Sequence, residues 1–447
     1  MKRVLALAVL SLASLSAAAL NQVERTSAAP PCGASVVPVA DHHAHLLSPA
    51  TVKLINPPPL PQIELPADLA RLLRARESAW NEKSALMKLY TEDSLVFDML
   101  DHRWIRGRAE VAAYLAELFA RPYRVTPIAC TTDGAAGHIA AYFTRGDGAS
   151  ASHFGQVLFS LRKGSDRSWR IAAESPSFPG PTSREPKTAE QLIAQLDDAG
   201  IQRAVLLSAA YWFGGPDMPK AEGDEYANVR AENDWNAGEA ARFPDRLVAF
   251  CSFNPLQDYA LAEIDRCAKL PHVKGLKLHF ANSNVEVKNP QHIEKLRRVF
   301  AAANEHRLAI VAHLWTGRTY GREDAEIFLN QILPAAPDVP VQIAHFAGGG
   351  PGYTDEALAV YADAIAAGDP RTKNLYFDVA TVADGQSDAT LSQFATRIRQ
   401  VGPKRVLFGT DLGPPPARQS WKIFRTTVPL TEDEIRTIAA NVAPYLR

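Results

Sequence analysis

The stretch Val273-Lys-Gly-Leu-Lys-Leu-His279 is a short, mostly apolar run that ends in a histidine. Such a run, bounded by turn residues, is typical of a strand that is buried on both faces of a parallel sheet. Six further runs share this design and alternate with helical patterns: 204–207, 247–253, 308–313, 339–345, 375–379 and 406–411. Strands that alternate with helices predict βαβ units, and therefore a parallel sheet.

Polar side chains stand at the ends of five of these runs at a nearly constant spacing. They are His279, His313, His345, Asp378 and Asp411, at successive intervals of 34, 32, 33 and 33 positions. Each interval fits one strand and one helix. The run 36–40, which continues into Asp41 and His42, supplies an eighth strand, and eight parallel strands close a TIM (β/α)8 barrel. We therefore predict an α/β barrel whose polar strand ends meet at its mouth.

One interval is far longer, since 163 positions separate His45 from Ser208 at the end of the second predicted strand. Stiff, proline-rich segments at 56–59 and 178–181 are typical of domain boundaries. Thr188 and Gln191 can form a capping box for the helix with which the barrel resumes. We predict a discontinuous barrel of residues 33–56 and 182–447. A separate domain at 62–178 is inserted between strand 1 and helix 1.

The pattern changes inside the insertion. Helices with apolar residues at i, i+3 and i+4 spacing precede strand-like runs near 139–143, 154–161 and 169–173, which favours an α+β domain with a curved antiparallel sheet. The segments 90–97, 105–111 and 169–175 resemble the SnoaL-like (NTF2-like) family. In such a domain Asp98, His102 and His153 could line a pocket. The alternative is a module for packing or dimerisation.

His43-Ala-His45 places two imidazoles at alternate positions of a strand, where both project to one side and can share a metal. A catalytic zinc takes about three protein ligands and leaves a position for water. His43, His45, His313 and Asp411 supply such a set. Asp411 could also accept a proton from metal-activated water, and His345 is then available as a general acid or base.

Five motifs together resemble the amidohydrolase-2 (ACMSD-like) branch of the amidohydrolase superfamily, from residue 36 to about residue 445. They are Asp41-His-His-Ala-His45, Val273-Lys-Gly-Leu-Lys-Leu-His279, Val311-Ala-His313, Ile343-Ala-His345-Phe-Ala-Gly-Gly349 and Leu407-Phe-Gly-Thr-Asp411. The resemblance implies that His43, His45, His313 and Asp411 bind metal and that His345 is catalytic. The family also contains nonoxidative decarboxylases, hydratases and a few metal-free lactonases. The segment 412–416 and the insertion depart from the family pattern, so substrate specificity does not follow from the resemblance.

Four further residues are candidates for binding substrate. Lys277 and His279 share one strand face, and Trp315 and Arg318 follow His313 in a loop where an aromatic ring and a cation would suit a carboxylated or aromatic substrate. The alternatives are a structural His279 and a solvated Arg318. Lys277 could instead be the bridging carbamate of a two-metal site. We expect one ion, because the branch that the sequence resembles mostly uses one.

Three functions follow from these residues. The first is hydrolysis of an amide, ester or lactone of a small organic substrate by metal-activated water, with Zn²⁺ or another divalent ion as cofactor. The second is metal-dependent nonoxidative decarboxylation or hydration of a carboxylated small molecule, with Arg318 as the carboxylate anchor. The third is a non-catalytic binding protein in which the barrel serves as a scaffold.

Composition limits the partners and the compartment. The 447 residues hold 48 basic and 49 acidic side chains, so no basic excess exists for nucleic acid. Lys2 and Arg3, an apolar run at 4–15 and small residues at 16–19 predict a signal peptide at 1–19. The mature protein would then be secreted or periplasmic and free of integral membrane association, with a retained anchor as the alternative. Four cysteines could pair in an oxidising compartment. A homodimer is compatible with the sequence.

Overall fold

The computed structural model describes residues 36–56, 59–79, 82–98, 103–118, 124–145, 152–177, 185–315, 320–412 and 415–447. The expected signal peptide at 1–19, as well as Cys32, His102 and Arg318, lie outside the described residues. The chain divides into two compact units. Of the described residues, one unit holds 36–54 and those from Pro186 onward, and the other holds those from Ile55 to Glu185.

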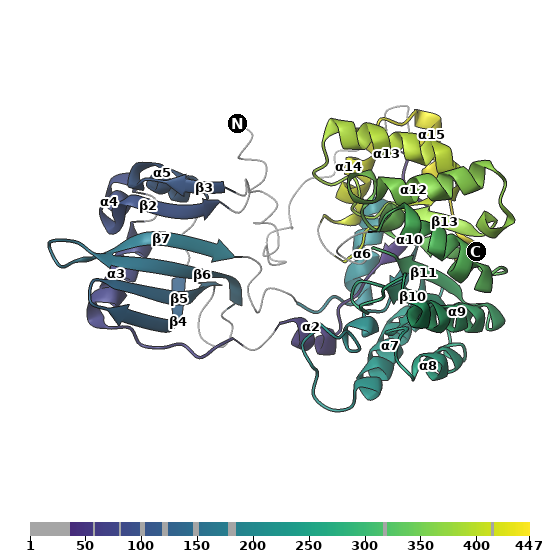
Figure 1. The fold of residues 1–447 in the computed structure, drawn as a ribbon, viewed down its shortest axis with the longest axis horizontal. Coiled ribbons are helices and arrows are strands. Elements are labelled where there is room, and N and C mark those ends of the chain that lie inside the picture. Colours follow the sequence, from purple (N-terminus) through teal and green to yellow (C-terminus); the bar gives the residue numbers. More distant parts are fainter. Residues whose placement is uncertain are drawn as a thin grey trace, which may run out of the picture. The chain divides into compact units, whose positions relative to one another are not determined.

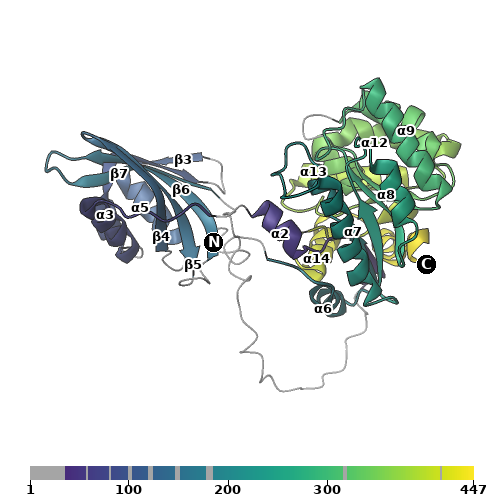
Figure 2. The same ribbon diagram turned by 90° about the horizontal axis from the view of Figure 1, so that it is seen from below.

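The first unit is a parallel eight-stranded barrel ringed by helices (Figures 1 and 2). In sheet order its strands are β1 (Ala40–Ala44), β8 (Arg203–Leu207), β9 (Leu247–Ser252), β10 (Val273–His279), β11 (Ala309–His313), β12 (Val341–Ile343), β13 (Leu375–Asp378) and β14 (Val406–Leu407). Every adjacent pair in this order is parallel. The predicted TIM barrel is confirmed.

The barrel closes between β14 and β1 through a few contacts beyond the end of the short strand β14. The amide of His42 donates to the carbonyl of Phe408 at 2.8 Å, and the amide of Thr410 donates to the carbonyl of His43 at 3.1 Å. A parallel bridge joins Ala44 to Asp411. This seam places His43 and Asp411 on neighbouring chain segments, although 368 positions separate them in sequence.

The first strand does not lie where the sequence pattern indicated. β1 covers Ala40–Ala44, so Asp41, His42 and His43 belong to the strand and the apolar run 36–39 does not. Those residues pair outside the ladder: the amide of Val39 donates to the carbonyl of Ala439, and the indole of Trp421 donates to the carbonyl of Val36. Pairing with the helical segments near residues 421 and 439 therefore takes the place of strand pairing.

The main helices that accompany the barrel strands are α6 (Ala189–Ala199), α7 (Glu225–Ala241), α8 (Ala260–Cys267), α9 (Pro290–Glu305), α10 (Arg322–Ile327), α12 (Pro351–Ala366), α13 (Asp388–Val401), α14 (Ala417–Thr427) and α15 (Glu432–Ala440). Shorter elements are α2 (Pro49–Ile55), α11 (His345–Gly349), η3 (Ala210–Trp212), η4 (Phe328–Ile332), η5 (Leu333–Ala335), η6 (Pro370–Thr372), η7 (Pro403–Arg405) and η8 (Pro444–Leu446). The capping box of Thr188 and Gln191 opens α6 as predicted. Among the described residues, no helix has the length and apolar character needed to cross a bilayer.

The barrel interior is filled by side chains that alternate along the strands. Val205, Leu207, Phe250, Val311 and Leu407 form one buried cluster. Gly275 is required beside it, because a Cβ there would lie 2.3 Å from the Phe250 ring and 2.5 Å from the carbonyl oxygen of Ala309. One disulfide, between Cys251 and Cys267, ties β9 to α8.

One pair of hydrogen-bonded residues joins the barrel segments that precede and follow the insertion. Leu47 and Lys187 form an antiparallel bridge in which each amide donates to the other residue's carbonyl, at 3.1 and 2.9 Å. His45 lies two positions before this bridge. The bridge therefore ties the chain that follows His45 to the chain that precedes α6, within the barrel unit.

The inserted unit is α+β, as predicted. Its helices are α3 (Ala67–Ser78), α4 (Lys83–Leu89) and α5 (Arg108–Leu118), and its strands are β2 (Tyr90–Asp98), β3 (Arg103–Arg106), β4 (Arg124–Asp133), β5 (Ala136–Arg145), β6 (Ser152–Lys163) and β7 (Trp169–Ser177). The sheet order is β3-β2-β7-β6-β5-β4, antiparallel except for β2 with β7. Leu69 and Leu72 of α3 and Val111 of α5 share a core with the sheet residues Ile139 and Ile171.

Candidate active site

The polar residues predicted from the strand ends meet at the carboxyl ends of the barrel strands. His43 lies in β1 and His45 directly follows it, while His279 and His313 end β10 and β11. His345 comes two residues after β12, and Asp411 lies in the segment that closes the barrel against β1. In barrels of this kind such positions point into the mouth where catalysis takes place.

Three of the four expected metal ligands form a tight group. His43, His45 and Asp411 each offer one ligand atom, and these atoms all lie within 4.8 Å of one another. The Nε2 atoms of His43 and His45 are each 3.6 Å from Oδ1 of Asp411. Two imidazoles and a carboxylate that share one point in space are suited to hold a divalent ion.

His313, the fourth expected ligand, is adjacent to this group but is not a member of it. Its ring stacks on His279, with centroids 4.0 Å apart, and meets the His345 ring at 4.9 Å. Nδ1 of His313 is buried and has no hydrogen-bond partner within the described part of the chain. A buried, unsatisfied ring nitrogen beside two histidines and a carboxylate fits a metal-binding residue, because buried polar atoms otherwise have partners.

His345 lies beside both His43 and Asp411, with its ring centroid 4.6 Å from that of His43. Its Nε2 is 3.8 Å from Oδ2 of Asp411, and its Nδ1 donates to the carbonyl of Ala380 at 2.9 Å. Because that carbonyl can only accept, the proton of the neutral ring is on Nδ1. Nε2 then carries the free lone pair and faces the site.

Burial sets the protonation of the site. It lowers the pKa of His43, His45, His279 and His313, so these imidazoles are neutral at pH 7, the form in which a ring nitrogen binds metal. Burial alone would raise the pKa of Asp411, but His345, His43 and His45 outweigh it and hold that pKa below its usual value. The group therefore combines neutral nitrogen donors with one carboxylate.

Lys277 lies inside the site rather than at its rim. Its side chain is buried, and its Nζ is 3.1 Å from Nε2 of His43. Burial lowers the pKa of Lys277 to about 8, while Asp378 and Asp411 act in the opposite direction. A cation is thus held against one of the expected metal ligands.

Both His345 and Asp411 have left-handed backbone conformations. The φ angles of His345, Phe346, Ala347 and Gly348 are 50°, 49°, 74° and 101°, and that of Asp411 is 65°. Non-glycine residues rarely adopt these angles, and such strain is concentrated at functional sites. Gly348 is required here, because a Cβ would lie 2.3 Å from Cβ of Trp315.

The expected substrate-binding residues have different surroundings. His279 lies between His313 and Tyr211, whose ring centroid is 4.9 Å away. Trp315 packs near Tyr353, with ring centroids 5.9 Å apart, and Arg318 lies outside the described residues. The sequence did not single out Tyr211 as a neighbour of His279, since it belongs to a long loop without periodicity.

Asp378 has a larger role than its sequence signal suggested. It is fully buried and accepts a hydrogen bond from Nδ1 of His43 at 3.0 Å and from the amide of His345 at 3.0 Å. A second group of potential ligands, formed by His43, His345 and Asp378, is explained by these bonds. The regular interval between strand ends is the sequence signal that marks this residue.

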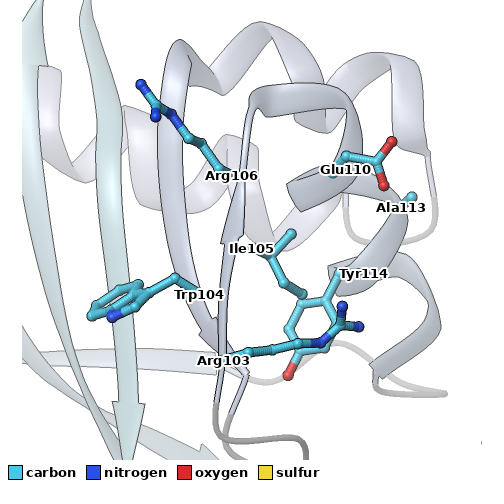
Figure 3. Close-up of a pocket in the computed structure, with 7 residues that line it drawn as sticks. All are labelled: Arg103, Trp104, Ile105, Arg106, Glu110, Ala113 and Tyr114. Atoms are coloured by element: carbon cyan, nitrogen blue, oxygen red, sulfur yellow. The ribbon is translucent and has the colours of Figure 1, made fainter.

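The inserted unit has a hollow of about 340 Å³ between β3 and α5, lined by Arg103, Trp104, Ile105, Arg106, Glu110, Ala113 and Tyr114 (Figure 3). Asp98, expected from the sequence to face a pocket, is instead buried and accepts a hydrogen bond from the Tyr114 hydroxyl at 3.1 Å. His153 packs edge-on against Tyr142, with ring centroids 4.8 Å apart. The residues that line this hollow do not include a group of histidines with a carboxylate like that of the barrel site.

Comparison with known proteins identifies one family. A family model described as amidohydrolase matches residues 40–439. No curated protein matches the chain. Similar solved structures include 5-carboxyvanillate decarboxylase from Sphingomonas paucimobilis, 20% identical with a TM-score of 0.43, covering 58% of this chain and 82% of the decarboxylase.

Two further solved structures are similar. The 2,6-dihydroxybenzoate decarboxylase from Rhizobium is 19% identical with a TM-score of 0.37, covering 58% of this chain and 88% of that one. A ketosteroid isomerase-like protein from Erwinia carotovora is 21% identical with a TM-score of 0.21, covering 25% of this chain and 94% of its own.

Proposed function

Because the chain belongs to the amidohydrolase family, we propose that it is a metal-dependent hydrolase that cleaves an amide, ester or lactone bond in a small organic substrate. The proposed ligands of the metal are His43, His45, His313 and Asp411. The observation that carries this proposal is the group of His43, His45 and Asp411, whose ligand atoms lie within 4.8 Å of one another at the barrel mouth. We further propose a single ion, with zinc as the first candidate.

A divalent ion bound there would supply Lewis acidity toward a substrate carbonyl and toward water. The protein supplies the proton transfers. Asp411 is ionised and 29% exposed at its side chain, so its carboxylate can take a proton from water that enters the mouth. Once protonated, His345 can pass a proton from Nε2 to the departing nitrogen or oxygen, since its Nδ1 is committed to the Ala380 carbonyl.

The substrate would be held by the residues around this proton path. We propose that Lys277, His279 and Trp315 contact it, with Arg318 as an additional cation from the same loop as Trp315. Stacked rings at His279 and His313 offer a flat wall for a planar group. The proposed roles of these residues are binding and orientation.

Carboxy-lyase activity is the second candidate, and the buried Lys277 favours it. An ammonium group 3.1 Å from Nε2 of His43 could hold the carboxylate of a substrate beside the proposed metal. In nonoxidative decarboxylation, the bond to that carboxylate breaks, carbon dioxide leaves and the ring carbon takes a proton. His345 would donate that proton from Nε2. Hydration of a carboxylated substrate would use the same groups.

Metal analysis combined with a substrate panel tests both candidates. We expect about one divalent ion per chain by elemental analysis, lost in His43→Ala and retained in His138→Ala, which removes an exposed histidine of the inserted unit. The panel contains amides, esters, lactones and aromatic carboxylates. Release of carbon dioxide without hydrolysis would reject the hydrolase in favour of the lyase. Full metal content in His43→Ala would reject the proposed site.

We also propose that the protein is exported and matures in an oxidising compartment. The disulfide between Cys251 and Cys267 supports this, because disulfides persist outside the reducing cytoplasm. Cell fractionation and N-terminal sequencing of the mature protein would test it, with cleavage near residue 19 expected. A cytoplasmic protein that keeps Met1 would reject it.

A further inference from the structure

A chain of buried hydrogen bonds runs from Tyr445 in η8 to the candidate site. Asp378 is its centre, and both carboxylate oxygens are fully used. Oδ1 accepts from the amides of His345 at 3.0 Å and Ala380 at 3.2 Å. Oδ2 accepts from Nδ1 of His43 at 3.0 Å and from Nε2 of Gln342 at 2.6 Å. One carboxylate thus contacts both an expected metal ligand and the backbone of the expected general acid.

The bond to His43 determines which ring nitrogen is available to a metal. Both oxygens of Asp378 already receive N–H donors from two backbone amides and from Gln342, so the carboxylate acts as an acceptor toward His43 as well. Nδ1 of His43 must then carry the proton. The lone pair of the neutral ring is therefore on Nε2, the atom that faces Asp411.

Gln342 holds Asp378 from the other side, and its own orientation is fixed by Tyr445. The amide nitrogen donates to Asp378 and to the carbonyl of His42 at 3.1 Å, while the amide oxygen accepts from the Tyr445 hydroxyl. If the amide were turned over, its oxygen would face the Asp378 carboxylate, and two acceptors would repel each other. The Tyr445 hydroxyl stabilises the orientation in which Gln342 donates to Asp378.

Tyr445 is rigidly placed for this role. Its ring packs against Phe250, with centroids 5.1 Å apart, and against His42 at 6.3 Å. Burial raises the pKa of Tyr445, so the hydroxyl keeps the proton that it donates. Neither Tyr445 nor Gln342 is among the side chains at the barrel mouth, and neither carries a signal in the sequence pattern.

We propose that Tyr445, Gln342 and Asp378 form a positioning chain that fixes the tautomer of His43 and the backbone of His345, and thereby sets the affinity of the site for its metal. The inference rests on the proposed function only for the presence of a metal. Its residues act through His43 and His345 and do not contact the substrate. We call these three residues the positioning chain.

Two substitutions test the positioning chain in the full-length protein. Asp378→Asn replaces an acceptor by an amide that can donate to His43, so the proton of that ring moves to Nε2 and metal affinity falls by about 10–100-fold, as for other residues that orient metal ligands. Tyr445→Phe removes only the hydroxyl and acts through Gln342 and Asp378, so a smaller loss of about threefold to tenfold is expected, below that range. Tyr361→Phe, which removes a buried hydroxyl hydrogen-bonded to Tyr320 in the same barrel unit, is the matched control and should leave affinity unchanged.

Affinity is measured by titration of metal-free protein with Zn²⁺ against a competing chelator. A double-mutant cycle then separates positioning from general loosening of the structure. If Tyr445 acts through Asp378, the double variant should bind metal no more weakly than Asp378→Asn alone. Additive losses, or unchanged affinity in both single variants, would overturn the proposal.

The tautomer of His43 gives a readout that does not depend on metal. In metal-free protein labelled with ¹⁵N-histidine, the ring shifts should report a proton on Nδ1 in the native chain and on Nε2 in Asp378→Asn. A native ring protonated at Nε2 would overturn the inference. If the native protein bound no metal but showed the Nδ1 tautomer, the proposed function would fail and the positioning chain would stand. Should Asp378→Asn not fold, Tyr445→Phe still carries the affinity test.

Discussion

At the scale of single residues, the lone pair on Nε2 of His43 decides how strongly the site can bind metal. Nδ1 of His43 donates to Asp378, so only Nε2 is left for a metal, and the Lys277 ammonium lies 3.1 Å from that atom. Lys277 and a divalent ion therefore compete for the same nitrogen. Like charges in a buried site also repel each other strongly.

Replacing the lysine should strengthen metal binding. Lys277→Met keeps the length and apolar stem of the side chain but removes the charge, and we expect about tenfold tighter Zn²⁺ binding, equivalent to about 1.4 kcal/mol. Chelator competition would measure it. Lys274→Met, at an exposed position of the same strand, should have no effect. Weaker binding in Lys277→Met would instead indicate that the lysine is a carbamate ligand of a two-metal site.

The sequence predicted well which side chains come together. It predicted less well which hydrogen bonds connect them. Regular spacing predicted that His345 and Asp411 meet, and the additional first strand brought in His43 and His45, because strand ends of a barrel converge whatever the intervening residues are. The same reasoning placed His313 nearby. Gln342 and Tyr445 could not be found this way, because hydrogen bonds between side chains of different strands leave no periodic signal.

At the scale of elements, the turn that carries His345 depends on tight packing against Trp315. Gly348→Ala would add a Cβ 2.3 Å from Cβ of Trp315 at a φ of 101°. We expect a loss of about 2–3 kcal/mol in the free energy of unfolding, together with reduced activity. Gly368→Ala is the control, since its φ is 68° but nothing lies within 4 Å, and about 1 kcal/mol is expected. Equal losses in urea denaturation would contradict the steric argument.

The capping box of α15 gives a pH-dependent prediction. Glu434 accepts from the amide of Thr431 at 2.7 Å and from Arg399 at 2.7 and 3.0 Å, and these bonds lower the pKa of Glu434 to about 2, chiefly through Arg399. A depressed carboxyl pKa stabilises the fold above the unfolded value near 4.5, and this contribution is lost as the pH falls toward 2.

Glu434→Gln should therefore cost about 0.5–1 kcal/mol at pH 7, and the difference from the native chain should shrink between pH 4.5 and 2. Urea denaturation at several pH values measures it. Glu305→Gln, at an exposed position of α9, should change stability little at any of these pH values. A difference for Glu434→Gln that stays constant with pH would contradict the ionic origin.

Local signals predicted some elements well and others poorly. The Thr188 and Gln191 capping box was recognised because its chemistry is confined to four consecutive residues. The first strand was misplaced because the apolar run 36–39 pairs outside the ladder, whereas the polar residues Asp41 to His43 form the strand. Polar strand residues are stabilised there by hydrogen bonds that only the closed barrel provides, such as that from Thr410 to Asp41 at 2.6 Å.

At the scale of the whole molecule, the two units have separate hydrophobic cores. We expect calorimetry to resolve two unfolding transitions, since each core can be lost without the other. Removing the metal with a chelator should lower only the barrel transition, because a ligand at 100 times its dissociation constant adds about 2.7 kcal/mol to the unit that binds it.

The two transitions can be assigned with one substitution. Leu69→Ala opens a cavity in the core of the inserted unit and should lower only that unit's transition. A chelator effect on the transition that Leu69→Ala lowers would contradict the assignment of the metal to the barrel. A single transition that both treatments lower would show that the units unfold together.

Chain length and spacing predicted the barrel and the place of its interruption, because a βα unit has a characteristic size and the gap after His45 greatly exceeds it. Other large-scale features had no such signal. In the order β3-β2-β7-β6-β5-β4, the parallel pair of β2 and β7 joins strands that are distant in sequence, and that pairing depends on packing of the whole sheet. The seam between β14 and β1 likewise consists of few contacts between segments that are distant in sequence.

The bridge between Leu47 and Lys187 has a consequence for how such a protein can evolve. The barrel segments before and after the interruption are held together at this bridge, so they are neighbours in space. The entropic cost of closing such an excursion grows only slowly with its length. A different module with neighbouring ends could therefore be exchanged at this point by recombination, and the histidines two and four residues upstream would keep their places.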